Sequence, residues 1–382
     1  MDKKNKNPNV PNLRFSYKGD WSKRKLNEIC LFFKGNGLSK SDLSNEGFPC
    51  ILYGELYTTY KNEVISDIIS KTNTTLSNPF LSRNNDLIIP GSGEDPIDIA
   101  VARAIYQNDI ILGGDLNILR PKSNVSAAFL SYQLNGVRRY DIAKKAQGKS
   151  IVHLHNSDLK EVLVSIPSYD EQLHIVKLLT KIDERIQTQS KIIDTLSSQK
   201  KQIRNLIFKD IHKNANCCIQ DYVIYEQPQK YIVHSTDYLS YGKDYTPVLT
   251  ANQSFILGYT LEKDGIYEKG DCIIFDDFTN ENKYVDFPFK VKSSALKILQ
   301  TKEGLMLKFF YEYLQFLNFE STDHKRHYLS EVAVTDISVP NLKEQTFVCK
   351  IFTSFDNKLK NEEALLEKYR LQKQFFLNNL FI

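Results

Sequence analysis

The chain has 382 residues, a net charge of +4 at pH 7, and 41% hydrophobic and 25% charged residues. This length suits about two domains of ordinary size, and the composition is typical of a soluble globular protein. No run of about 18 apolar residues occurs, which argues against a membrane span, and the polar residues 1–11 do not resemble a signal peptide. So small a positive charge supports nucleic-acid binding only where it is concentrated locally.

The cysteines indicate a reducing compartment. None of the six forms a CxxC pair, and adjacent cysteines are poor partners for a disulfide: Cys30, Cys50, Cys217, Cys218, Cys272 and Cys349. We therefore expect free, mostly packed thiols in a cytoplasmic protein.

The first part of the chain, residues 12–167, mixes short strand-like and helical stretches. Asp86 to Ile89 (DLII) is typical of a strand, and Ala127 to Leu134 of a helix. A second strand-like stretch, Val162 to Ile166, is followed by Pro167, which cannot lie inside a helix. Neither Gly nor Pro then occurs up to Phe208, so a long uninterrupted helix is predicted.

The second part repeats this order. Strand-like DCII (Asp271 to Ile274) is matched to DLII, and a helical stretch follows at Leu305 to Leu317. Val334 to Val339 and Pro340 then precede another stretch without Gly or Pro. Residues 165–208 and 338–381 align without a gap, and the alignment has these identities: Pro167/Pro340, Glu171/Glu344, Gln172/Gln345, Lys177/Lys350, Asp183/Asp356, Lys200/Lys373 and Phe208/Phe381. One module has therefore been duplicated.

The two predicted helices share a heptad pattern. Alternating steps of three and four residues give a mostly apolar series whose polar interruptions fall at the same two places in both helices. The series are Ile182, Ile186, Gln189, Ile193, Leu196, Lys200 and Ile203 in the first helix, and Phe355, Leu359, Glu362, Leu366, Tyr369, Lys373 and Phe376 in the second. The shared pattern favours a mutual coiled coil over two amphipathic helices that pack on separate cores.

The polar seam positions indicate the orientation of the helices. In a parallel pair Lys200 would face Lys373, whereas in an antiparallel pair Lys200 faces Glu362 and Gln189 faces Lys373. We therefore predict antiparallel helices and an approximate two-fold axis between the repeats. The predicted fold is α+β, with globular domains at 1–167 and 209–340 and long helices at 168–208 and 341–382.

Three motifs resemble a known family. They are NVPNLRFSYKGDWSKRKLNEI (Asn9 to Ile29), GKSIVHL (Gly148 to Leu154), and the Pro…Glu-Gln pattern at the start of both helices. Together with the repeat they resemble the specificity subunits of type I restriction-modification systems. The second domain departs from the first, because HKRHYLSEV (His324 to Val332) replaces the GKS motif there.

The resemblance implies a division of labour. Each domain would be a target-recognition domain that reads one half of a split DNA target, and the helices would set the spacing and dock two methyltransferase subunits. Restriction/translocase subunits would join the assembly. Catalysis would lie on these partners, with S-adenosylmethionine, ATP and Mg bound there and no cofactor or metal on this chain. The setting would be phage defence in the cytoplasm of a bacterium or an archaeon.

The helix length agrees with such a spacing role. The seam from Ile182 to Ile207 is roughly 38 Å long at about 1.5 Å per residue. One turn of B-DNA, the usual separation of two half-sites read from one face, is about 34–36 Å.

Two basic clusters are candidate contacts to the DNA backbone. The first surrounds the AQGKSI segment, which lacks the earlier glycine of a nucleotide-binding loop because Ala143 stands there. Phosphate contact is the favoured interpretation, and a solvated basic face remains the alternative. The clusters consist of Arg138, Arg139, Lys145 and Lys149 in domain one and of Lys325 and Arg326 in domain two.

Polar loops are the candidate base-reading elements, because Asn, Gln, Arg and Lys distinguish base edges. Each residue alone could also be an ordinary turn or surface residue. The candidates are Tyr57, Thr58, Thr59 and Ser92 in domain one, and Thr250, Asn252, Gln253, Ser254, Thr279, Lys292 and Ser293 in domain two.

Catalytic motifs are weak. Asn78-Pro79-Phe80 lacks the second proline of a methyltransferase motif, and His153/His155 and His324/His327 have no nearby metal-binding partners. Asp276 and Asp277 precede Glu281 and Lys283, but this short spacing argues against the two strands of a nuclease hairpin, so a loop is predicted. The alternatives to DNA recognition are a coiled-coil scaffold with two protein-binding heads and a self-sufficient nuclease or methylase.

Overall fold

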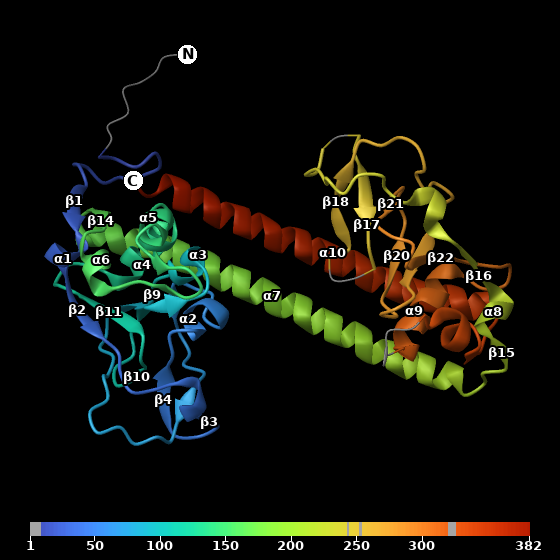
Figure 1. Cartoon of the computed structure of the whole chain (residues 1–382), viewed down its shortest axis with the longest axis horizontal. Coiled ribbons are helices and arrows are strands. Elements are labelled where there is room, and N and C mark those ends of the chain that lie inside the picture. The colour runs from blue at the N-terminus through green and yellow to red at the C-terminus, as the bar shows by residue number, and fades with distance from the viewer. Residues whose placement is uncertain (1–8, 243, 252–253, 320–325) are drawn as a thin grey trace, which may run out of the picture. The chain divides into compact units, whose positions relative to one another are not determined.

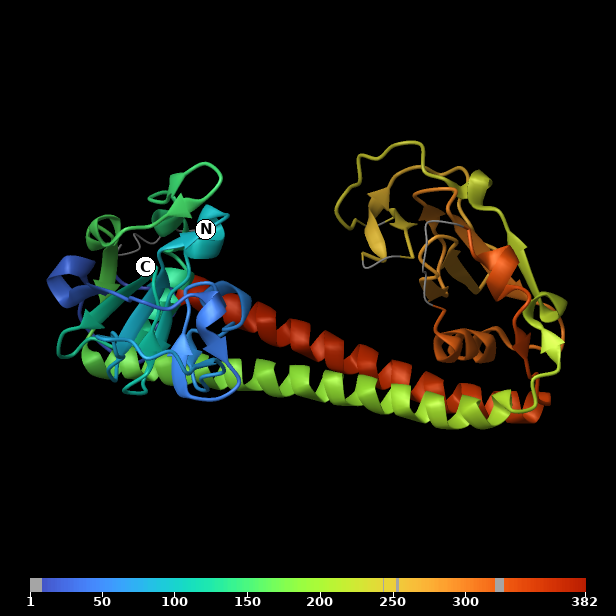
Figure 2. The same cartoon turned by 60° about the horizontal axis from the view of Figure 1, so that its bottom comes forward.

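The structure, a computed structural model, describes residues 9–242, 244–251, 254–319 and 326–382. It divides into two compact units (Figure 1): unit 1 comprises the chain up to Ser190 together with 364–382, and unit 2 comprises 191–363. Two long helices, α7 (Tyr169–His212) and α10 (Leu342–Asn379), each contribute one half to either unit and can be followed along their length in Figure 2. Both helices begin two residues after a proline, as predicted.

Unit 1 is built on two mixed sheets. The larger has the order β2-β11-β7-β9-β5, and all its neighbours are antiparallel except β5 and β9. Its strands are β2 Cys30–Lys34, β5 Val64–Ile65, β7 Asp86–Pro90, β9 Arg103–Ile105 and β11 Leu116–Pro121. The smaller has the order β10-β4-β6-β3, with β3 Leu43–Ser44, β4 Phe48–Ile51, β6 Lys71–Thr72 and β10 Ile111–Leu112.

Short elements complete unit 1. Strands β1 (Ser22–Lys25) and β14 (Leu163–Ile166) form an antiparallel pair, and β12 (Gln147–Gly148), β13 (Val152–His153) and β8 (Ser92–Gly93) form a small sheet. The helical elements are α1 Leu26–Ile29, η1 Lys40–Asp42, α2 Glu55–Thr58, α3 Pro96–Ile99, α4 Ala127–Asn135, α5 Arg139–Ala143 and α6 Asn156–Lys160.

The central strands of unit 1 are buried on both faces. On β7, Leu87 and Ile89 point to the core that contains α4, whereas Ile88 points to a second core on the opposite face. This explains why DLII is a continuous apolar run and not an alternating one. The Ser126 side chain caps α4 by accepting a hydrogen bond from the backbone N–H of Phe129.

Unit 2 repeats this plan with fewer strands. Its main sheet is β16-β22-β19-β20, and a second sheet is β18-β17-β21. The strands are β15 Cys217–Cys218, β16 Val223–Glu226, β17 Thr246–Leu249, β18 Ile256–Thr260, β19 Cys272–Asp276, β20 Asn282–Val285, β21 Lys290–Val291, β22 Leu296–Thr301 and β23 Asp336–Ile337. The helical elements before α10 are α8 Ile219–Tyr222, η2 Pro228–Tyr231, α9 Leu307–Leu317 and a π-helical turn, η3, at Tyr328–Val332.

The same glutamine joins helix and domain in both units. The Gln172 carboxamide accepts from the N–H of Ser126, before α4, and donates to the carbonyls of Asn124 and Pro167. Gln345 makes the same three bonds with Met306, before α9, and with Gly304 and Pro340. The predicted duplication therefore extends from the helices into the domains, where α4 corresponds to α9.

The predicted match of DLII with DCII is wrong by one residue. Ile88 pairs with Ile118 across the unit 1 sheet, and Ile274 pairs with Ile298 at the equivalent place in unit 2. Ile88 therefore corresponds to Ile274, whereas the gapless match assigned Ile89 to it. Because side chains alternate along a strand, a slip of one residue exchanges the two faces. Both strands are apolar on both faces, so the sequence pattern could not fix the register.

The two long helices run antiparallel, as predicted. In unit 1, Leu179 near the start of α7 packs in one cluster with Leu380 beyond the end of α10. In unit 2, Phe208 near the end of α7 packs against Phe352 near the start of α10, with ring centroids 6.2 Å apart. The predicted seam residues are all buried or half-buried, in keeping with the heptad pattern.

The predicted register of the seam is wrong. The Lys200 ammonium lies 2.6 Å from a carboxylate oxygen of Asp356, six residues from the predicted Glu362, and 3.0 Å from Glu312 of α9. The Lys373 ammonium lies 2.7 Å from Asp183, six residues from the predicted Gln189, and 2.7 Å from Glu63. Glu312 and Glu63, which lie outside the two long helices, therefore help to set the register in which the helices pair. A comparison of the two helix sequences alone cannot reveal their effect.

All six cysteines are free thiols. Within the described residues, no helix is both long enough and apolar enough to span a membrane.

Candidate nucleic-acid interface

The GKS motif of unit 1 forms the turn of a β-hairpin. Strands β12 and β13 pair antiparallel, and Lys149 and Ser150 lie exposed between them beside Ile151. Gly148 has a φ of 133°, and a Cβ atom there would meet the carbonyl oxygen of Ile151 at 2.0 Å. Only glycine fits this backbone. The motif thus exposes a lysine at the tip of a defined hairpin and forms no nucleotide-binding loop.

Two further candidate side chains, Ser92 on strand β8 and Tyr57 on α2, lie close to this hairpin. Ser92 on β8 is paired with His153 on β13, and the Ser92 hydroxyl lies 3.3 Å from His153 Nδ1. The Tyr57 hydroxyl, from α2, lies beside Gly93 of the same strand. Burial raises the pKa of this phenol, so it stays protonated and can donate a hydrogen bond. Tyr57, Ser92 and Lys149 therefore belong to neighbouring elements.

The other unit 1 candidates differ in their contacts. Thr58 and Thr59 are exposed at the end of α2, where the Thr58 hydroxyl donates to the Gly54 carbonyl. Lys145 is half-buried before the hairpin. Arg138 bonds the carbonyl of Ile382, and Arg139 bonds the carbonyl of Ile97. Both arginine side chains therefore make structural contacts.

In unit 2 the candidates gather around residues 292–295. The N–H of Lys292 donates to the Leu249 carbonyl, next to Thr250, and the Ala295 carbonyl accepts from Asp277 near Thr279. Lys292, Thr279 and Ser254 are exposed, whereas Thr250 and Ser293 are half-buried. Asn252 and Gln253 lie outside the described residues.

Arg326 lies on the same side of the fold as Thr279. Its guanidinium is 5.8 Å from the centroid of the Phe278 ring, and the next residue, His327, donates its N–H to the Asp277 carbonyl. The arginine is exposed. Lys325 and His324, the first residues of the HKRHYLSEV segment, lie outside the described part of the chain.

The segment around Asp276 does form a hairpin, contrary to the prediction. Strands β19 and β20 pair antiparallel through Phe275 and Asn282. Asp276 Oδ1 accepts hydrogen bonds from the N–H groups of Phe278 and Thr279, which closes a tight turn. Asp277 pairs with the buried Lys297 at 3.0 Å. The tight Asx turn explains why so short a connection suffices.

His153 and His155 stack with ring centroids 6.2 Å apart. Among the described residues, the group of three possible metal ligands is His234, Glu262 and Asp264. Glu262 already pairs with the buried Lys290 at 2.8 Å and accepts from two backbone N–H groups. His234 and Asp264 are about three-quarters exposed, at 75% and 74%. The ion pair of Glu262 with Lys290, with His234 and Asp264 exposed beside it, accounts for this group.

Two buried charge clusters were not predicted from the sequence. In unit 2, Glu312 is fully buried and contacts Lys200, Arg204 and Lys308, and both lysines also contact Asp356. In unit 1, Lys373 joins Asp183 to Glu63, and Tyr132 donates to Asp183 at 2.7 Å. The sequence did contain an indication of both clusters, because Asp183/Asp356 and Lys200/Lys373 are identical pairs in the alignment of the two repeats. Each cluster attaches a domain to its helix pair.

Two copies of one α+β framework, with shared helix anchors and dissimilar polar loops, define a tandem-domain protein. Residues 18–198 match the family model of the type I restriction modification DNA specificity domain. Just under half of the chain is thus similar to that domain.

Two curated relatives are specificity subunits. The EcoR124I/EcoR124II type I restriction enzyme specificity subunit of Escherichia coli is 39% identical over 170 residues, which cover 41% of either chain. The MjaX type I restriction enzyme specificity subunit of Methanocaldococcus jannaschii is 24% identical over 205 residues, 50% of this chain and 45% of that one. The matches thus span less than half the length of these relatives.

Solved structures share the fold over nearly the whole chain. The S subunit of a type I restriction-modification system from M. genitalium has a TM-score of 0.66 and 18% identity, and the match covers 98% of this chain and 99% of that one. A chain from a type I R-M system complex has a TM-score of 0.54 and 13% identity, with 96% and 99% covered.

Proposed function

We propose that this chain is the DNA-recognition subunit of a type I restriction-modification assembly, in which each unit reads one half of a split target. The observation that carries the proposal is the duplication. The Gln172 and Gln345 anchors are the same in both units, whereas the loops around Ser92 and Lys292 differ. Such a pattern suits two domains that share one framework and bind different half-sites.

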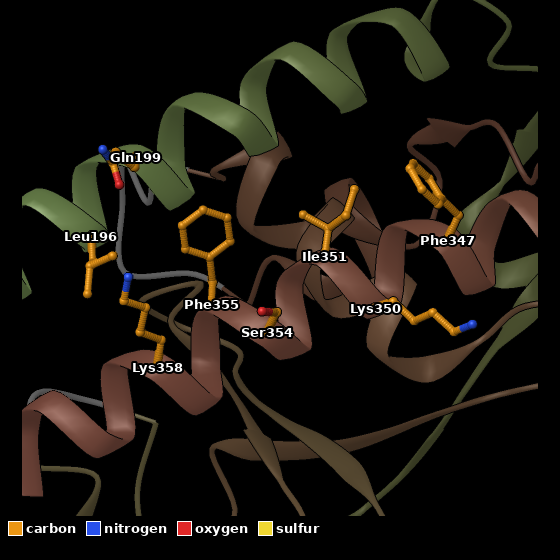
Figure 3. Close-up of a pocket in the computed structure, with 8 residues that line it drawn as sticks. All are labelled: Leu196, Gln199, Phe347, Lys350, Ile351, Ser354, Phe355 and Lys358. Atoms are coloured by element: carbon orange, nitrogen blue, oxygen red, sulfur yellow. The ribbon is translucent and has the colours of Figure 1, made fainter.

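In this proposal the helices set the spacing and dock the methyltransferase subunits. A groove of about 580 Å³ in unit 2 supports docking, since it is lined by Leu196 of α7 and by Phe347, Ile351 and Phe355 of α10. Figure 3 shows these apolar side chains along the groove, with Lys350 and Lys358 on α10 beside them. Phe347 is 67% exposed, and exposed apolar side chains of this kind mark protein contacts.

Catalysis would then lie on the partners. We expect S-adenosylmethionine, ATP and Mg to bind methyltransferase and restriction/translocase subunits, two of the former, and the assembly to act against phage DNA in the cytoplasm. The system could also lack restriction subunits and only methylate. The purified chain alone is expected to show neither nuclease nor methylase activity.

Methylome sequencing tests the proposal. A host that expresses the chain with its methyltransferase partner should carry a methylated motif in two parts. Exchanging domain 12–167 should change one part, and exchanging domain 209–340 the other. A single continuous motif would overturn the proposal. If Lys145→Glu with Lys149→Glu left assembly and DNA affinity intact, a protein-binding scaffold would be favoured.

A further inference from the structure

The N-terminal segment of unit 1 covers the first turn of α7. The Arg14 guanidinium makes two hydrogen bonds of 2.7 Å to the carboxylate of Glu171, one from Nε and one from Nη2. The indole N–H of Trp21 donates to the same carboxylate at 3.3 Å. Glu171 is therefore only 1% exposed. A two-pronged arginine–carboxylate pair of this kind is among the stronger polar contacts in proteins.

Aromatic side chains accompany the arginine. The Phe15 ring lies 6.1 Å from the imidazole of His174, one helical turn after Glu171, and the Tyr17 hydroxyl is hydrogen-bonded to His174 Nδ1. The backbone N–H of Leu13 donates to the carbonyl of Asn379 near the end of α10. The segment thus places a cation and an aromatic ring on one face of α7.

Among the described residues of unit 2, no such segment covers the same helix face. Glu344 and Phe347 of α10 are the repeat equivalents of Glu171 and His174, and both are exposed. The register of β1 with β14 and of β15 with β23 makes Asn214 the equivalent of Trp21. Only four residues separate α7 from β15. The Asn214 amide therefore takes the place of the Trp21 indole. The four-residue connection is too short to include an equivalent of Arg14.

A pocket occupies the place of the missing segment. It has a volume of about 520 Å³ and includes Glu344, Phe347 and Val348 from α10, Ile207 and Ile211 from α7, and Asn214. We call it the Glu344 pocket. Its charged side chains are Glu344, Lys343 and Asp210, so acids outnumber bases. Apolar lining residues together with the Glu344 carboxylate suit an arginine that is followed by an aromatic residue.

We propose that the Glu344 pocket binds an extended segment of a partner polypeptide that carries an arginine next to an aromatic residue. The partner's guanidinium would pair with Glu344 as Arg14 pairs with Glu171, and its ring would pack on Phe347 and Ile211. The site shares Phe347 with the groove of Figure 3 and is otherwise separate from it. The inference does not depend on DNA recognition.

A peptide with the sequence of residues 9–20, NVPNLRFSYKGD, is a direct probe. Fluorescence anisotropy with the full chain should show saturable binding. Glu344→Gln in the chain, or alanine in place of the arginine of the peptide, should weaken binding at least about tenfold, the loss expected for a charged hydrogen-bond pair. Phe347→Ala should also weaken it. Glu363→Gln, an exposed acid of α10 outside the pocket, is the matched control and should bind normally.

Three results would overturn the proposal. The first is no saturable binding. The second is binding that survives Glu344→Gln but is lost in Glu171→Gln, since the peptide would then displace the chain's own segment. The third is a dimer in analytical ultracentrifugation that Glu344→Gln dissociates, which would make a second copy the occupant. Because Glu344 and Phe347 are exposed, their variants should unfold in urea like the wild type.

Discussion

At the scale of single residues, the repeat has placed the same side chains in different charge environments. Asp183 shares Lys373 with a second acid, Glu63, so the unit 1 cluster has more acids than lysines. Asp356 instead contacts two lysines, Lys200 and Lys308. Identical residues at equivalent positions therefore need not have equal pKa values.

The pKa shifts have opposite directions. For Asp183, burial raises the pKa, and Lys373 only partly opposes it. For Asp356, burial also raises the pKa, but hydrogen bonds from Lys200 and Lys308 outweigh burial and lower it below the ordinary 3.8. Asp356 therefore contributes stability that is present above its unfolded pKa and lost as pH falls through its folded pKa. Asp183 loses its contribution as pH rises through its raised folded pKa.

We therefore predict different pH profiles for two conservative variants. Asp356→Asn should reduce the loss of stability on the acid side, at and below pH 3.8. Asp183→Asn should reduce the decline as pH rises above that value, because its ordinary pKa is the same. Urea midpoints measured from acid to neutral pH would test both. Profiles parallel to the wild type in both variants would contradict the assigned shifts.

A second residue-scale prediction concerns the hairpin lysine. Lys149→Ala should weaken binding to target and non-target duplexes by a similar factor and lower the slope of log affinity against log salt by about one, because one phosphate contact is lost. Lys368→Ala, an exposed lysine of α10, serves as the control. Anisotropy titrations over a salt series measure the slope, and an unchanged slope would place Lys149 away from the DNA.

At the scale of elements, the glutamine anchors hold each domain helix to its long helix. Gln172 and Gln345 are fully buried, and each satisfies one N–H and two carbonyl groups at the junction of a loop and a helix. A leucine of similar size would leave all three backbone groups without these partners. Buried unsatisfied groups cost more than the bonds themselves contribute.

Gln345→Leu should thus lower the free energy of unfolding by about 3 kcal/mol, and Gln172→Leu by a similar amount. Gln202→Leu, at an exposed position of α7, should stay within about 0.5 kcal/mol of the wild type. Urea denaturation followed by circular dichroism distinguishes these outcomes. Equal small effects for all three variants would show that the anchors are dispensable.

At the scale of the whole molecule, two continuous helices, α7 and α10, contribute to both units, so under the proposed function their length would set the gap in a split target. Seven residues inserted in each helix, after Ser190 and after Glu363, keep the heptad pattern and add about 10.5 Å. That corresponds to roughly three base pairs of B-DNA. We predict that the two halves of the methylated motif keep their sequences while the gap between them changes. Methylome sequencing would test this, and an unchanged gap would refute a spacing role.

The duplication and the two long helices can be predicted from the sequence alone. The antiparallel orientation is also predicted correctly, although the partner that this prediction assigns to Lys200, Glu362, is wrong. The two helices follow from local signals: Pro167 and Pro340 mark the starts, Gly and Pro are absent between them and the helix ends, and apolar residues recur every three or four positions. Local signals act between residues close in the chain, so one sequence suffices to recognise them.

Contacts between distant residues set the register of the helices and strands, and they also determine which loops meet. Asp356, not Glu362, faces Lys200 because Glu312 and Lys308 of α9 also contribute charges there. The match of Ile88 with Ile274 depends on strand pairing, since both strands are apolar on both faces. Which loops meet, as Ser92 meets the GKS hairpin, depends on contacts between distant residues. Packing selects such contacts, and no local pattern encodes them.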